Sequence, residues 1–193
     1  MGKLVTSDNI PVNGMNQNMV SDTFAWTWAY DPISINAGFQ VVNGTLYLVR
    51  MPVRELPTPF TDTLWILHTA GVAPVAGQNW SGLYSPNGEL LVKGNIDGTL
   101  VAPLGVKNVV FGETGLSDAT PSFVWGALLF NAATPPFVGM SGAIAANVSN
   151  FGIQAFPQLA RFATNGTGRT DLPNQIAPTS NSPIAQSIFM AAG

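Results

Sequence analysis

The segment 79–95 most constrains the fold, because it consists of two apolar runs separated by a compact turn. Pro86 presets φ for the second position of a turn, Asn87 tolerates unusual backbone angles, and Gly88 adopts a positive φ without a steric penalty. The segment therefore predicts a strand, a tight turn and a second strand. An isolated hairpin is only marginally stable in water, so we expect this one to join a larger sheet.

The rest of the chain supplies further apolar or alternating runs but no convincing helix. The segment 123–130 is nearly all apolar and predicts a central strand covered on both faces. This strand begins at Ser122, and other strands are predicted at 24–30, 45–51, 62–69, 106–111, 161–164 and 184–192. Residues 70–77 are rich in Gly, Ala, Pro and Val and predict a loop. Residues 131–160 are rich in Ala, Gly, Pro and Asn and predict a long loop or a short helix at 144–148. Residues 165–183 are a further passage rich in Gly, Asn and Pro.

Roughly eight strands without a helix favour two packed sheets. We therefore predict an all-β protein, a two-sheet, jelly-roll-like β-sandwich that forms a single domain over residues 24–193. Residues 1–23 are polar and rich in Asn, and no helical or strand period is visible in them. We expect this segment to be an extended N-terminal arm that anchors the domain to a neighbouring molecule.

The segment 24–30 alternates large aromatic residues with small ones, which is typical of a strand with one apolar face. This face would carry Phe24, Trp26, Trp28 and Tyr30. Burying each ring is worth about 2–3 kcal/mol, so we favour a core or subunit-interface role for them. The alternative is a platform on which sugar rings stack.

Only 9% of the 193 residues are charged, whereas an average soluble domain has about 25%. A surface so poor in charge favours a protein built into an assembly. The net charge is −3 and no basic run is present, which argues against nucleic-acid binding. No apolar stretch reaches the roughly 18 residues that span a bilayer, so no membrane insertion is expected.

No catalytic residue is predicted. His68 is the single histidine, and we interpret it as a structural or surface residue because no partner motif accompanies it. The segment 139–143 resembles a nucleophile elbow, but it lacks the last glycine and the strand–turn–helix context, so a flexible loop is expected. The ten carboxylates are scattered, and nothing marks a facing pair of the kind that glycosidases use.

No cofactor or metal site is predicted either. The segment 95–99 has a trace of a calcium-loop rhythm but lacks further oxygen ligands, so a plain turn is expected. The chain has no cysteine, which excludes thiolate metal ligands and disulfides. Four N-glycosylation sequons are present, at Asn43, Asn79, Asn147 and Asn165. They would be used only if the protein passed through a eukaryotic secretory route.

Several short stretches follow one another along the chain: an early Thr-Leu-Tyr-Leu strand, a Gly/Ala loop, the hairpin, an apolar strand and a small, apolar end. They lie at 44–50, 69–72, 76–79, 82–84, 88–91, 123–131, 161–163, 170–173 and 187–193. Taken in this order, they resemble the β-sandwich modules of minor tail and fibre-type virion proteins from tailed phages of actinobacteria.

This resemblance implies a non-catalytic structural protein of the virion, assembled in the bacterial cytoplasm. The implied partners are other virion proteins, bound through residues 1–23, and further copies of the chain, with a trimer among the options. A host cell-surface glycan is a candidate ligand. The resemblance leaves open a capsid-decoration or head-fibre role, and a free carbohydrate-binding module is the alternative from another class.

Overall fold

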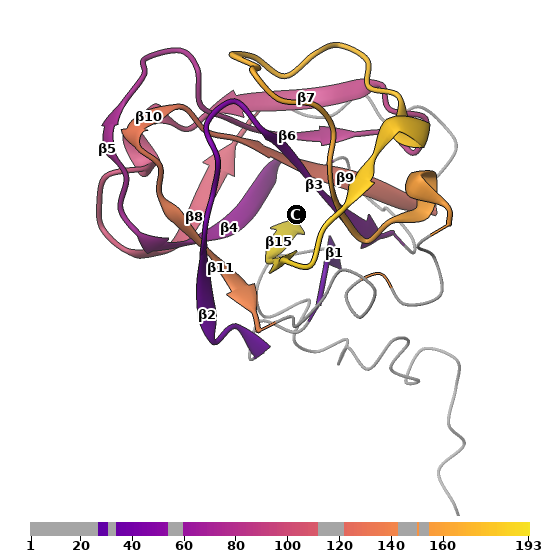
Figure 1. Ribbon diagram of the computed structural model, residues 1–193, viewed down its shortest axis with the longest axis horizontal. Coiled ribbons are helices and arrows are strands. Elements are labelled where there is room, and N and C mark those ends of the chain that lie inside the picture. Colours follow the sequence, from indigo (N-terminus) through magenta and orange to yellow (C-terminus); the bar gives the residue numbers. More distant parts are fainter. Residues whose placement is uncertain (1–26, 31–33, 54–59, 112–121, 143–149, 151–154) are drawn as a thin grey trace, which may run out of the picture.

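The computed structural model describes residues 27–30, 34–53, 60–111, 122–142, 150 and 155–193 (Figure 1). These residues form antiparallel sheets that pack on one another, which confirms the predicted all-β sandwich. The 3-10 turns among them include three of three residues each, Asp97–Thr99, Pro157–Leu159 and Pro178–Ser180. No helix in this part of the chain is long and apolar enough to cross a membrane. The predicted arm, residues 1–23, lies outside the described residues.

One sheet has six strands, and the strand β9 (Phe123–Leu129) lies near its centre between β3 (Leu46–Pro52) and β6 (Trp80–Tyr84). Every residue of β9 is buried, so the prediction of a doubly covered central strand is confirmed. The predicted hairpin joins this sheet, with β7 (Leu90–Asn95) at the edge. On the far side of β3, the sheet continues with β12 (Phe162–Thr164) and ends with β13 (Ser182–Pro183).

The second sheet is built around β4 (Asp62–Thr69), which pairs along one side with β8 (Gly105–Val110). On its other side β4 pairs with β11 at Leu67 and Thr69, and with β15 from Thr63 to Trp65. The C-terminal strand thus fills the space where β4 and β11 separate, because its first part pairs with β11 and its second with β4. The remaining bounds are β1 (Thr27–Trp28), β2 (Ala37–Gln40), β11 (Phe137–Ser141), β14 (Ser187–Ile188) and β15 (Met190–Ala192).

The structure corrects two predicted loops and one predicted strand. The segments predicted as loops at 70–77 and 131–160 contain β11 and a small two-stranded sheet of β5 (Val72–Pro74) and β10 (Ala132–Thr134). Strands of three residues are too short to show a period. The last strand, predicted over 184–192, begins at Ser187 and divides at Phe189, because β14 and β15 pair with different neighbours. The alternative helix at 144–148 lies outside the described residues.

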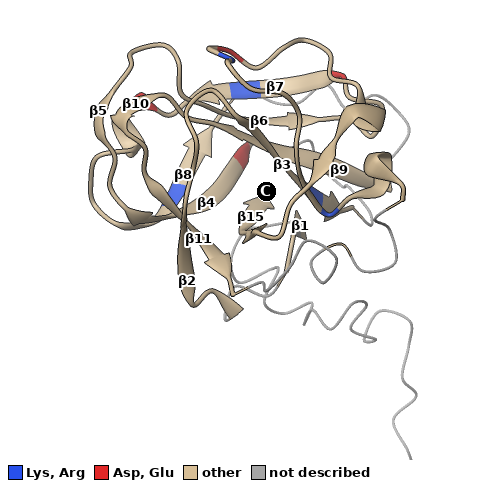
Figure 2. Ribbon diagram, in the orientation of Figure 1, with Lys and Arg blue, Asp and Glu red and all other residues tan. Residues whose placement is uncertain are grey.

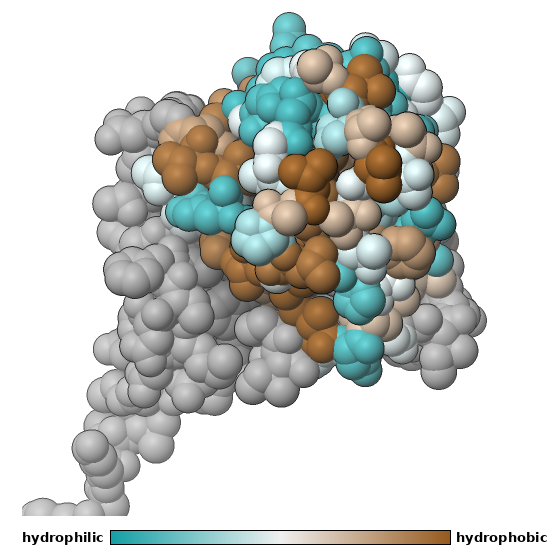
Figure 3. Space-filling model, turned by 90° about the vertical axis from the view of Figure 1, so that its left-hand side faces the viewer, coloured by the Kyte–Doolittle hydropathy of each residue, from teal (hydrophilic) through white to brown (hydrophobic). Residues whose placement is uncertain are grey.

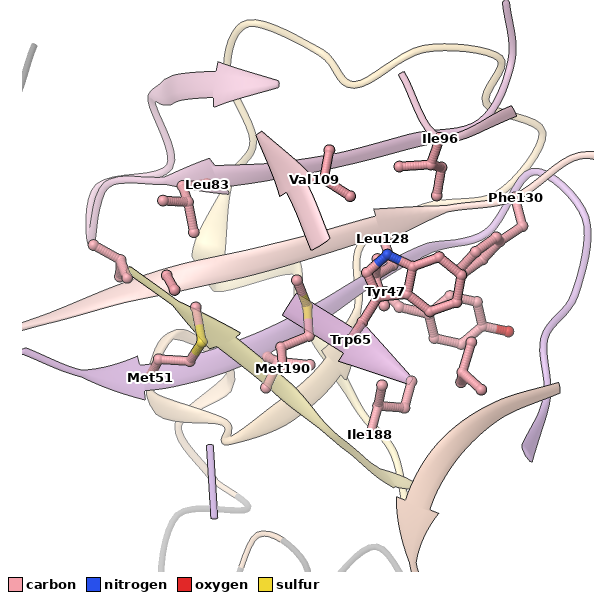
Figure 4. Packing of buried hydrophobic residues seen from close by; sticks show 14 of the residues in the cluster. Tyr47, Met51, Trp65, Leu83, Ile96, Val109, Leu128, Phe130, Ile188 and Met190 are labelled. Carbon is pink, nitrogen blue, oxygen red and sulfur yellow. The ribbon is translucent and has the colours of Figure 1, made fainter. Parts of the chain in front are cut away.

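The main core lies between the two sheets (Figure 4). Trp65 of β4 packs edge-on against Phe130, with ring centroids 5.5 Å apart. Met51 of β3 and Met190 of β15 lie on opposite sheets and point into the same interior (Figure 4). Such alternating bulky residues exclude water from between the sheets, which supplies most of the favourable free energy of folding.

A second apolar cluster covers the outer face of the six-stranded sheet. Trp125 and Tyr84 lie in it, and Leu172 and Ile176 cover it from the segment 165–183. The Tyr84 hydroxyl donates to the Pro173 carbonyl at 2.9 Å. The Gly/Asn/Pro-rich passage therefore covers this cluster, which explains why both faces of β9 are buried.

Candidate contact surfaces

The predicted aromatic face begins outside the described residues, since Phe24 and Trp26 are not among them. The backbone of Trp28 is described, and it pairs with Ala191 of β15. Tyr30 is the one member of the face whose side chain is described. The interface or sugar-stacking role of the complete face therefore stays a prediction.

Tyr30 is half-buried and makes contacts within its own chain. Its hydroxyl donates to the Ser187 carbonyl at 2.6 Å and accepts a hydrogen bond from the Ser141 N–H at 2.9 Å. Its ring packs edge-on against Phe162 and Phe189, with centroids 6.1 and 5.8 Å away. Burial raises the pKa of Tyr30, and the hydrogen bond from Ser141 only partly opposes this, so the phenol stays neutral. This side chain joins the two sheets.

The tryptophans whose side chains are described do not form an exposed row. Trp65 and Trp125 are fully buried. Trp80 is half-buried, its indole N–H donates to the Thr170 carbonyl at 3.2 Å, and the Lys93 ammonium lies 4.6 Å above its ring. A sugar-binding platform needs open aromatic faces, and none of these three indoles offers one.

His68 lies at the exposed end of β4. Its Nδ1 is 3.2 Å from the Thr69 hydroxyl, and its ring lies so close to Gly38 that a Cβ there would be 2.5 Å from Nδ1. Asp62 occupies the other end of the same strand, about 20 Å away at the usual rise per residue. Among the described residues, no carboxylate forms an ion pair with His68.

The segment that resembles a nucleophile elbow is a strand up to Ser141, so the predicted flexible loop was wrong there. Gly139 pairs with Gly38 of β2, and Met140 pairs with Ala37 and with Ile188 of β14. Ile66 of β4 packs so closely that a Cβ at Gly139 would lie 2.8 Å from its Cβ. This glycine therefore allows the close approach of a neighbouring side chain.

Asp97 holds the turn that has a trace of calcium-loop rhythm. Its carboxylate accepts hydrogen bonds from the Gly77 N–H at 2.7 Å, the Asn79 amide at 2.8 Å and the Asn95 amide at 3.1 Å. Partial burial alone would raise the pKa of Asp97, but these donors outweigh it and lower the pKa. The carboxylate is thus an acceptor for N–H groups. Within the described residues, no three His, Asp or Glu side chains gather as a metal site would require.

Replacing Asp97 by Asn is expected to change how stability depends on pH. A carboxyl whose pKa is lowered by folding stabilises the protein above its unfolded value, ordinarily 3.8, and loses that effect as the pH falls through the folded value. The wild type should therefore melt at a higher temperature than Asp97→Asn at pH 7, and the difference should shrink below about pH 4. Asp62 has a raised pKa in both proteins, so its contribution cancels in the comparison. Melting curves from pH 7 to 2 check this, and a constant difference would contradict it.

Buried asparagines fix several loops, a role that was not predicted from the sequence. Asn79 donates to the Val75 carbonyl at 2.9 Å and accepts from the Asn131 N–H at 2.6 Å. Asn150 is fully buried, donates to the Phe162 carbonyl at 3.2 Å and accepts from the Arg161 N–H at 2.7 Å. In a chain with few charges, amides provide both a donor and an acceptor to loop backbones.

Two of the four sequons are inaccessible in the folded protein, because Asn79 and Asn165 are buried. The Asn165 amide donates to the Ala177 carbonyl at 3.0 Å and to the Asn181 side chain at 2.8 Å. Asn43 is exposed, although its amide donates to the Ala132 carbonyl at 2.7 Å. Asn147 lies outside the described residues. The asparagines that recur in the Gly- and Pro-rich segments of the sequence could have indicated that their side chains hydrogen-bond to loop backbones.

An exposed apolar surface lies on the side of the sandwich that carries β5 and β8 (Figure 1). The outward side chains of β8, Val106 and Val110, are 65% and 74% exposed, and Leu104 before the strand is 60% exposed. The Gly71 N–H donates to the Leu100 carbonyl at 2.9 Å, which brings the start of β5 beside the loop that leads into β8. Figure 3 shows hydrophobic residues across the middle of this side. We call this surface the apolar band: Val72, Val101, Leu104, Val106 and Val110.

The face that carries the apolar band includes an acidic side chain, because Asp62 of β4 pairs with Val110 and opposed residues share a face of the sheet. The Asn108 amide donates to the Asp62 carboxylate at 3.4 Å. Lys107 lies within β8, but it is 7% exposed and its ammonium donates to the Pro103 carbonyl. Asn108 is the polar residue between Val106 and Val110 on the outward face. A surface of this composition suits contact with another protein better than chemistry on a small molecule.

The comparisons with known proteins assign no family. The sequence matches no family model, and no curated protein matches it. The function therefore has to be argued from the residues and the structure.

Proposed function

We propose that this chain is a structural protein of a tailed-bacteriophage virion, a β-sandwich displayed on the particle as a minor tail, fibre-type or host-contact module. In this proposal residues 1–23 anchor it to other virion proteins, and it has no catalytic role. The apolar band carries the proposal, because Val106 and Val110 expose apolar surface on a face where Asp62 is the charged neighbour. The resemblance to phage sandwich modules is the reason for placing this contact on a virion.

We assign the apolar band to contact between copies of this chain on the particle. Aspartate at Leu104 and Val106 is expected to shift the protein toward monomers without unfolding it, because both side chains are exposed and Val106 lies opposite the uncharged Ile66. Light scattering after size exclusion measures the mass. Phe156→Asp is the control, since Phe156 is also exposed but precedes the 3-10 turn Pro157–Leu159, outside the band. Equal masses for all variants would contradict this assignment.

The anchoring role is tested by deleting residues 1–23. The shortened chain should fold and keep the melting temperature of the sandwich, yet it should be lost from purified particles. Immunogold electron microscopy of particles with the full chain distinguishes tail from head. Incorporation of the shortened chain at wild-type levels would contradict anchoring through this segment, and labelling of the head would favour the capsid-decoration alternative.

A further inference from the structure

Two arginines lie opposite each other, Arg50 on β3 and Arg161 directly before β12. The Arg50 N–H of β3 donates to the Arg161 carbonyl at 2.8 Å, and the register continues with Val49 opposite Phe162 of β12. Opposed residues share a face of the sheet, with Cβ atoms about 5 Å apart. Like charges in this arrangement destabilise a sheet unless something neutralises them.

The structure holds Arg50 in a defined position. Its guanidinium lies 4.3 Å from the centroid of the Phe123 ring, and its Nη1 donates to the Leu159 carbonyl at 3.0 Å. Phe123 belongs to the apolar cluster on the outer face of the six-stranded sheet, so Arg50 points to that face. Burial, followed by the charge of Arg161, lowers the pKa of Arg50, as expected for two crowded cations. Arg161 itself is exposed.

No carboxylate neutralises this pair within the described part of the chain. The ion pair found there joins Lys93 to Asp171 at 2.5 Å, and Arg169 is held by the carbonyl of Asn165 at 2.9 Å. Figure 2 shows a blue segment at the end of β3 in a ribbon that is otherwise mostly uncharged. Two positive charges therefore face the same space without a described counter-charge.

We propose that Arg50 and Arg161 bind a phosphate group between them. Each guanidinium is a planar fork of N–H donors that suits bidentate contact with oxyanions. A phosphate dianion matches the two charges and has oxygens for both forks, whereas a carboxylate carries one charge and two oxygens. The Phe123 ring and the Leu159 carbonyl fix Arg50 in advance, which lowers the entropy cost of binding. This inference does not depend on the proposed virion role.

Inorganic phosphate is the probe for this site. At constant ionic strength, phosphate in place of chloride should raise the melting temperature of the wild-type chain, because a ligand of the folded state stabilises it. Arg161→Gln should melt above the wild type in chloride, since it removes the like-charge repulsion, and it should lose most of the gain from phosphate. Lys93→Gln is the control that removes one positive charge elsewhere, and it should keep the full gain.

A titration followed by the NMR signal of the Arg50 Nε–H group measures the affinity directly. Binding should be saturable, and it should weaken about tenfold or more in Arg161→Gln, because charge-assisted hydrogen bonds are lost. An equal gain from phosphate in Arg161→Gln and the wild type would overturn the proposal. Acetate binding as tightly as phosphate would also overturn it, because the assignment rests on a dianion.

Discussion

Removal of residues 187–193 is expected to abolish cooperative folding of this protein. The segment supplies β14 and β15, which fill the space between β4 and β11. Its Ile188, Phe189 and Met190 are all buried, and losing three such side chains costs roughly 5–9 kcal/mol. The whole stability of a domain is about 5–15 kcal/mol, so little would remain. The Gly193 carbonyl also accepts from the Asp62 N–H at 3.0 Å.

Thermal and urea unfolding followed by tryptophan fluorescence measure this effect. The shortened chain should show no sigmoidal transition, and it should bind a dye that reports exposed apolar surface. Met190→Leu is the matched control, because a swap that keeps the volume costs less than about 1.5 kcal/mol. A shortened chain that melts cooperatively near the wild-type temperature would show that β4 and β11 close the sheet without the C-terminal strand.

Among glycine-to-alanine substitutions in the described residues, Gly88→Ala is expected to cause the largest loss of folding stability, for two reasons. Gly88 has φ of +88°, where a side chain is strained, and a Cβ there would lie 2.3 Å from the Ile176 carbonyl oxygen. That carbonyl belongs to the cover over the outer cluster, which is tied to the turn because the Ile176 N–H donates to the Gly88 carbonyl at 2.8 Å. Strain and overpacking together should cost about 3 kcal/mol or more.

Gly77→Ala separates the two causes. Gly77 also has a positive φ, +73°, but no atom lies within 4 Å of the position a Cβ would take. This variant should lose only about 1–2 kcal/mol, the cost of the left-handed backbone alone. Urea unfolding gives both free energies. Equal losses would mean that the cover moves away from Gly88 without cost, and that it is not packed against the turn.

The predicted strands were right where the apolar pattern is long. The hairpin at 79–95, the strand at 62–69 and the apolar strand around Val124 all showed enough residues for a period or an unbroken run. The short strands escaped detection for a physical reason. β5 and β10 have three residues each, and β11 carries a glycine at its centre, so their pairing is set by neighbours brought from elsewhere in the chain.

The contact surfaces were less predictable than the strands. Alternation along β8 indicates which side chains share a face, but only the packing shows that Val109 is buried and Val110 exposed. Arg50 and Arg161 are separated by more than a hundred residues, and no local pattern brings them together. The same holds for Asn79 and Asn131, whose hydrogen bond depends on the sandwich being formed.

The sequence by itself determined the all-β class, the turn at Gly88 and the burial of β9 on both faces, because these follow from local backbone preference and from unbroken runs of apolar side chains. Only the tertiary structure decided how the C-terminal strand is shared between β4 and β11, and that the segment 165–183 covers the outer cluster. Those arrangements depend on contacts between distant residues, whose free energy is gained only when the sheets have come together.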